Sequence, residues 1–130
     1  MTNTIILLAM IYMHIIDDFY LQGILAKMKQ QSWWKKQEGY NDFYGSDYIV
    51  ALIIHGISWG ISINIPLMAA HLLGYLTINE GAFMIILVMN VILHIMIDDM
   101  KANLKWINLQ IDQILHFLQV IATYVIIMYS

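Results

Sequence analysis

Histidine and aspartate residues recur near one end of each of four apolar stretches in this 130-residue chain. The set consists of His14 and Asp18, His55, His94 and Asp98, and Asp112 and His116. Three of these pairs are spaced four residues apart, so a helix would place both side chains on one face. Imidazole and carboxylate groups are typical ligands of zinc, iron and manganese. The pattern therefore predicts a metal site built from several helices.

The composition indicates that lipid is the solvent of these stretches. The chain is 61% hydrophobic and only 12% charged, and a soluble domain of this size could not bury so much apolar surface. The net charge is −3 and there is no arginine, so we expect no nucleic-acid partner. The absence of cysteine excludes thiolate ligands.

Four helices are predicted to span the membrane. We place them at Thr4–Ala26, Tyr48–Leu73, Gly81–Met100 and Leu109–Tyr129. Each is long enough, or nearly so, to cross about 30 Å of hydrocarbon. The connection 27–47 mixes lysine with aromatic residues, which favours a short interfacial segment at the lipid headgroups. The predicted fold is all-α: one transmembrane domain over residues 1–130, an integral membrane four-helix antiparallel bundle.

The lysines predict the orientation of this bundle. All six lie in or beside the first and third connections: Lys27, Lys29, Lys35, Lys36, Lys101 and Lys105. The positive-inside rule places that side in the cytoplasm. We therefore expect a multi-pass protein of the cytoplasmic (inner) membrane of a bacterium or phage host, with both termini extracytoplasmic. The predicted ligands then form one layer in the cytoplasmic leaflet.

Helical phase extends the pairs into polar stripes that should meet inside the bundle. The expected metal ligands are His14, Asp18, His55, His94, Asp98, Asp112 and His116, with Gln22 and Gln113 beside them. They would bind one or two divalent ions, zinc first, with iron or manganese as alternatives. Two ions would lie about 3.5–4 Å apart around a bridging water. With one ion, some aspartates would instead orient ligand histidines.

Four other polar residues receive separate interpretations. Lys101 is the only cation expected near the ligands. Asp17 is about 60° from His14 on a helix and could contribute, whereas Asp99 is expected to face the surface. His71 lies near the opposite end of its stretch without an acidic partner, and we interpret it as a packing or hydrogen-bonding residue.

The combined strings resemble a family of small bacterial and phage membrane proteins of unknown function. They are His14-Ile-Ile-Asp-Asp18-Phe19-Tyr-Leu-Gln22, His55, His94-Ile-Met-Ile-Asp98-Asp-Met-Lys101 and Asp112-Gln113-Ile-Leu-His116. The matching patterns are His-x-x-x-Asp-Phe-x-x-Gln, an isolated His, His-x-x-Ile-Asp-x-x-Lys, and Asp-Gln-x-x-His. The resemblance implies that these His, Asp, Gln and Lys residues form the family's polar core. It implies no activity.

The leading functional hypothesis is a membrane-integral metal-dependent hydrolase, although whether the chain is an enzyme stays open. A metal-activated water would attack an ester or phosphoester carried on a lipid at the cytoplasmic leaflet. The catalytic candidates are Asp18, Asp98 and Asp112, any of which could act as general base, and Lys101, which could stabilise negative charge. Gln22 or Gln113 could assist Lys101.

Three other functions stay open. An ion or proton pathway, or a divalent-metal carrier, would also use intramembrane Asp and His. No continuous polar stripe reaches the far side, although a homo-oligomer could supply a pore. A bis-histidine haem protein is disfavoured because carboxylates are poor axial ligands. A phage lysis or exclusion protein would leave the polar layer unexplained.

Overall fold

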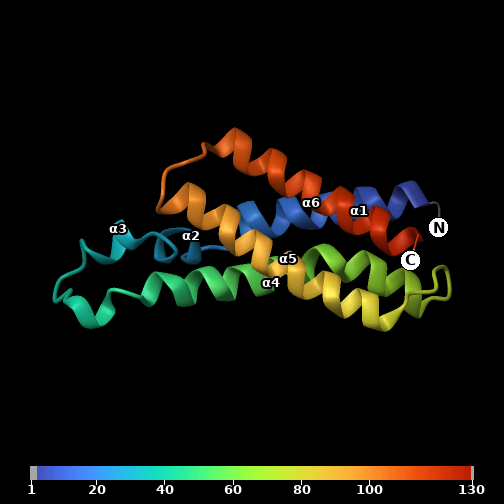
Figure 1. Cartoon of the computed structure of the whole chain (residues 1–130), viewed down its shortest axis with the longest axis horizontal. Coiled ribbons are helices and arrows are strands. Elements are labelled where there is room, and N and C mark those ends of the chain that lie inside the picture. Colours follow the sequence, from blue (N-terminus) through green and yellow to red (C-terminus); the bar gives the residue numbers. More distant parts are fainter. Residues whose placement is uncertain (1–2, 130) are drawn as a thin grey trace.

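The computed structural model describes residues 3–129 and is built from four long helices (Figure 1). They are α1 (Asn3–Ile16), α4 (Asp47–Leu72), α5 (Glu80–Ala102) and α6 (Leu109–Tyr129). A π-helix, η1 (Asp17–Leu21), continues α1. No strand occurs among residues 3–129, so the all-α prediction is confirmed. All four long helices, α1 together with η1, are long and apolar enough to cross a membrane.

The first helix ends earlier than the predicted 4–26. Helical structure stops at Leu21, and Gly23 adopts a φ of +48°, a left-handed conformation that glycine tolerates without a Cβ penalty. The chain then forms two short helices, α2 (Leu25–Met28) and α3 (Gln31–Trp34), and a 3₁₀ turn, η2 (Asp42–Tyr44). The connection between the first two long helices is therefore folded.

The connections divide between the two ends of the molecule (Figure 1). The two termini and the connection 73–79 lie at one end, and the connections 22–46 and 103–108 lie at the other. Helix α4 packs against α1 and α5, and α6 packs against α5 and α1. Side chains from all four long helices therefore face a common interior.

Local signals fix the helix ends. The side chains of Asn79 and Asn108 accept hydrogen bonds from the backbone N–H of Ala82 and Ile111, which caps the first turns of α5 and α6. At the end of α4, Gly74 has a φ of +75°. Its N–H donates to His71, and the next N–H, from Tyr75, donates to Ala70, as in a Schellman motif.

Two glycines let α4 and α5 approach closely. A Cβ on Gly56 would lie 2.6 Å from Cγ1 of Ile95, and one on Gly60 would lie 2.7 Å from Cγ2 of Val91. Small residues four apart are a common device for close helix packing in membranes. This contact brings the rings of His55 and His94, one on each helix, to a centroid distance of 4.9 Å.

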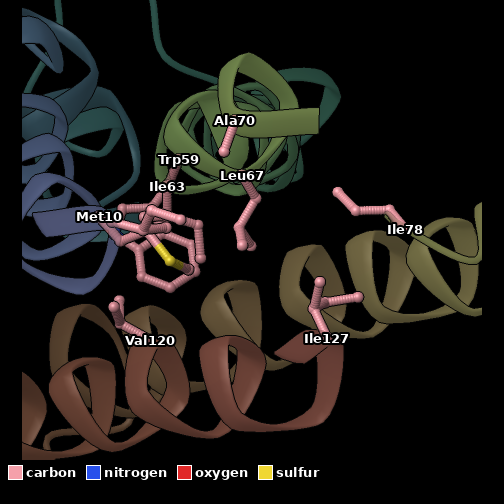
Figure 2. Packing of buried hydrophobic residues seen from close by; sticks show 9 residues of the cluster. Met10, Trp59, Ile63, Leu67, Ala70, Ile78, Val120 and Ile127 are labelled. Carbon is pink, nitrogen blue, oxygen red and sulfur yellow. The ribbon is translucent and has the colours of Figure 1, made fainter. Parts of the chain in front are cut away.

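The interior toward the termini is apolar. We call this region the apolar cluster, consisting of Ile6, Met10, Trp59, Ile63, Leu67, Ala70, Ile78, Val120 and Ile127. Most of these side chains are fully buried, and Figure 2 shows those of α4 packed toward Met10 and Val120. The buried aspartates, and the histidines predicted as ligands, lie toward the other end of the same interior.

Candidate metal centre

Side chains from η1, α4, α5 and α6 converge at the end of the interior opposite the termini. We call them the His/Asp cluster: Asp18, His55, His94, Asp98, Asp112 and His116. Each is at most 3% exposed. The structure therefore brings together six of the seven predicted ligands, and the helices alone supply them.

The cluster contains two groups of potential ligands. One group is Asp18, His55, His94 and Asp98, and the other is Asp18, Asp112 and His116; within each, ligand atoms lie within 4.8 Å of one another. With metal–ligand bonds of about 2.0–2.2 Å, ligand atoms on opposite sides of one ion are about 4 Å apart. Small side-chain movements would therefore bring the atoms of either group to binding distance of an ion. These buried groups can hold a metal ion, and Asp18 belongs to both.

Several ligand atoms in the cluster have no hydrogen-bond partner among residues 3–129. Both ring nitrogens of His94 and of His116 are in this state, as are one oxygen of Asp98 and one of Asp112. Nε2 of His116 lies 3.6 Å from Asp98 Oδ1 and 3.5 Å from Asp112 Oδ1. Buried polar atoms are normally satisfied, so such a concentration favours an additional group between them.

The π-helix directs two consecutive carboxylates inward. Asp17 and Asp18 are both buried, whereas the next three residues of η1 are exposed. Asp17 Oδ1 accepts hydrogen bonds from the hydroxyls of Ser58 (2.7 Å) and Ser62 (2.9 Å) on α4. π-Helical turns are frequent at functional sites because the wider turn changes which side chains face inward.

His55 lies between two carboxylates. Its Nε2 is 3.2 Å from Asp18 Oδ1, and its Nδ1 is 3.7 Å from Asp17 Oδ2. In many metal sites the outer nitrogen of a ligand histidine donates to a carboxylate, which fixes the tautomer and the ring orientation. Asp17 therefore lies beside the outer nitrogen of His55, slightly beyond hydrogen-bond distance.

His14 differs from its predicted role as a ligand. Its Nδ1 accepts a hydrogen bond of 2.8 Å from the indole N–H of Trp59, so its Nε2 carries the proton and donates to Gln113 Oε1 at 3.2 Å. Both nitrogens are thus engaged by protein groups, and His14 belongs to neither ligand group. The local four-residue spacing to Asp18 could not reveal these partners on α4 and α6.

Aromatic stacking holds two of the imidazoles. The ring of His94 stacks on the indole of Trp59 and on the ring of His116, with both centroid distances at 4.2 Å and interplanar angles of 19° and 29°, and the Trp59 and His116 rings are themselves 5.5 Å apart. The same indole hydrogen bonds to His14. Trp59 therefore connects the cluster to the apolar interior beneath it.

Lys29, which was assigned only to the polar connection, is buried at the cluster. Its side chain is 5% exposed, and Nζ lies 2.5 Å from Asp98 Oδ2. The Asn103 side chain fixes this segment, since it donates to Lys29 O (3.1 Å) and accepts from Gln31 N–H (2.8 Å). Lys101 is thus not the only nearby cation. A lysine in an aromatic-rich connection carries no periodic signal that would predict burial.

The predicted auxiliary residues surround the ligands. Lys101 Nζ lies 2.5 Å from Asp112 Oδ2, and its side chain is 23% exposed. Gln113 Nε2 donates to Asp18 Oδ2 (2.7 Å) and to Asp112 Oδ2 (3.0 Å), which ties the two carboxylates together. Gln22 donates instead to the backbone carbonyl of Asp18.

Two further expectations concern residues outside the cluster. His71 hydrogen bonds to the carbonyl of Leu76 at 3.0 Å, which agrees with a structural role. Asp99 is partly buried rather than fully at the surface, and it accepts a hydrogen bond of 2.7 Å from Asn103. It therefore supports the residue that positions Lys29.

The charges of this region do not balance. Asp17, Asp18, Asp98 and Asp112 are buried carboxylates, and the two lysines, Lys29 and Lys101, offset only half of their charge. With neutral imidazoles, an excess of two negative charges remains. Uncompensated buried charge is costly, and one divalent cation supplies the missing charge.

Comparisons of the chain with family models, with curated proteins and with solved structures find no match. The geometry of the cluster is therefore the basis for a functional proposal.

Proposed function

We propose that the chain is a membrane-embedded metal-binding protein. The four long helices cross the inner membrane as an antiparallel bundle, because they have the required length and apolarity and their termini and connections alternate between two ends. All six lysines lie at or beside the end that carries the connections 22–46 and 103–108. By the positive-inside rule this end is cytoplasmic, and both termini are extracytoplasmic.

One observation carries the proposal: Asp18 is shared by two groups of buried potential ligand atoms, and the ring nitrogens of His94 and His116 in these groups have no hydrogen-bond partner in the described chain. Two ions could be held with Asp18 between them, or one ion in either group. Mixed imidazole and carboxylate groups suit zinc best among common metals, and also iron or manganese.

We further propose hydrolysis of a lipid-linked ester or phosphoester at the cytoplasmic leaflet. A divalent ion would supply Lewis acidity at this site. The carboxylate of Asp112, one oxygen of which has no partner within the described chain, is placed to accept a proton from water. Lys101 and Gln113 each contact Asp112 and place donors where negative charge would develop.

A surface cleft supports access from lipid. It is lined by Ile15, Phe19, Tyr20 and Phe117 together with Gln113. Gln113 also hydrogen bonds to both Asp18 and Asp112, so one residue separates the cleft from the ligands. Phe19 and Tyr20 are 54% and 76% exposed, which gives an acyl chain an apolar surface to lie against.

A conducting role receives less support. The apolar cluster fills the interior between the ligands and the ends of the helices near the termini (Figure 2). The polar residues Asn90, Gln119 and Thr123 hydrogen bond to one another across α5 and α6 rather than forming a file. A conduction path generally requires polar or hydrated groups along its whole length.

The test is hydrolysis by zinc-loaded, detergent-purified protein of two probes, dioctanoyl phosphatidic acid and a para-nitrophenyl octanoate. We expect turnover of at least one probe. The turnover rate of the His116→Ala variant should fall about 100-fold, because loss of a metal ligand should reduce activity more than loss of a residue that hydrogen bonds to a ligand. His71→Ala is the matched control and should retain turnover. Absence of turnover with both probes, or turnover at the wild-type rate by His116→Ala, would refute the proposed hydrolase activity.

A further inference from the structure

A second, basic pocket adjoins the metal centre at the connection end. Its volume is about 250 Å³, and it is lined by Gln22, Ala26, Lys29, Gln30, Lys101, Ala102 and Lys105. Three of these seven residues are lysines, and the lining residues include no carboxylate. The pocket thus combines positive charge with two side-chain amides, a composition suited to an anion.

Two of the lysines link the pocket to the ligands. Lys29 and Lys101 line the pocket, and their ammonium groups contact Asp98 and Asp112 at 2.5 Å, so the pocket adjoins these carboxylates. A cation bound by these carboxylates would compete for the same oxygens and leave the ammonium groups free to contact an anion. An anion in the pocket would therefore lie beside the metal centre.

Lys105 is not engaged by any acid in the described part of the chain. Its Nζ donates a hydrogen bond to the backbone carbonyl of Ala102 and forms no ion pair among residues 3–129. It is also the one non-glycine residue there with a positive φ, 59°. Such strained backbone is concentrated at functional positions. Lys105 is therefore the member of the pocket most available to a ligand.

We infer that this pocket binds the phosphoryl group of the substrate. The inference rests on the proposed function and narrows it from an ester or phosphoester to a phosphoester. Three lysines line one space, and Lys105 has no acidic partner in the described chain, so the pocket suits an oxyanion with several acceptor oxygens better than a neutral carboxyl ester, which offers no charge to pair with Lys105. The phosphoryl group could belong to a lipid headgroup or to free phosphate.

Calorimetric titration of the full chain in maltoside detergent tests this inference. The three titrants are inorganic phosphate, dioctanoyl phosphatidic acid and dioctanoylglycerol, which has the same acyl chains without the phosphate. We expect binding of the phosphorylated titrants and none of dioctanoylglycerol. Tighter binding of phosphatidic acid would indicate a headgroup, and equal or tighter binding of phosphate would indicate the free anion. Equal binding of phosphatidic acid and dioctanoylglycerol, or no phosphate-dependent binding, overturns the inference.

Variants assign the binding to the pocket. Lys105→Gln should weaken phosphate binding about tenfold, because it removes one charged donor, and Lys105→Arg should restore it. Lys36→Gln makes the same charge change at an exposed lysine outside the pocket and should bind as wild type. Identical affinities of Lys105→Gln and Lys36→Gln would overturn the inference. Metal content should be unchanged in both variants. If the chain binds phosphate but no metal, the proposed function is refuted, whereas the inference of a phosphate-binding pocket is not.

Discussion

The two halves of the helical interior differ in the side chains that dominate them. Toward the termini the same helices enclose the apolar cluster, and toward the connections they enclose the His/Asp cluster. In the proposed bilayer location, apolar side chains would gain little from leaving the solvent, so the apolar half would act through close packing. The polar half would be costly to bury unless its charges were compensated. Close packing therefore determines how the helices are arranged, and charge compensation decides whether the polar half is stable.

His71 and His94 illustrate the same contrast within one residue type. His71, near the end that carries the termini, hydrogen bonds to one carbonyl and has no acidic partner among the described residues. His94 is fully buried against two aromatic rings, and neither ring nitrogen has a hydrogen-bond partner in the described chain. Burial together with missing partners distinguishes the candidate ligand from the structural histidine.

The largest effect is expected for Asp98→Ala. It removes a candidate ligand and leaves the ammonium group of Lys29 buried without its partner. Loss of one member of a buried ion pair costs about 3–5 kcal/mol. The free energy of unfolding in detergent should fall by this amount. The double variant Asp98→Ala with Lys29→Met should recover a substantial part of it, and a double variant no more stable than Asp98→Ala would contradict the pairing.

Leu67→Ala should destabilise the apolar half without changing the metal centre. Leu67 is fully buried in the apolar cluster, and truncation to alanine creates a cavity costing about 2–5 kcal/mol. Because Leu67 contributes no ligand, the metal content of the folded protein should equal that of wild type. Measuring the free energy of unfolding and the metal content of the same preparation would test both expectations. A parallel loss of metal would mean that the two halves are not separable.

Gly60→Ala tests the close approach of α4 and α5. The added Cβ would meet Val91 Cγ2 at 2.7 Å, and such overpacking costs about 1–3 kcal/mol. We expect weaker metal binding as well, since this contact positions His55 against His94. Gly81→Ala is the matched control: its Cβ would meet only Asn79 Oδ1 at 3.5 Å, so the unfolding free energy should stay level or rise. Equal effects of the two substitutions would exclude the contact as their cause.

His71→Ala should have the smallest effect. It removes one hydrogen bond at the end of α4, which contributes about 0.5–1.5 kcal/mol. Metal content and any hydrolysis should be unchanged in this variant. If His71→Ala lost metal, the distinction between the two histidines would be wrong.

The sequence predicted the helices and most of the cluster because both depend on local periodicity. Apolar length identifies the helices, and the four-residue spacing of His94 and Asp98, or of Asp112 and His116, places each pair on one face. The roles of His14 and Lys29 depend on partners on other elements, Trp59 and Asp98, which no local spacing encodes. The burial of Asp17 accompanies a π-helical turn for which the sequence gives no signal.

The most direct test of the account is the metal content of the detergent-purified chain compared with its Asp18→Asn variant. Elemental analysis should find one or two first-row divalent ions per wild-type chain. Asp18→Asn should lose them, because both ligand groups share this carboxylate, whereas His116→Ala should retain an ion held by the group around His94. A folded wild-type chain that binds no metal, or an Asp18→Asn variant with undiminished metal, would contradict the account.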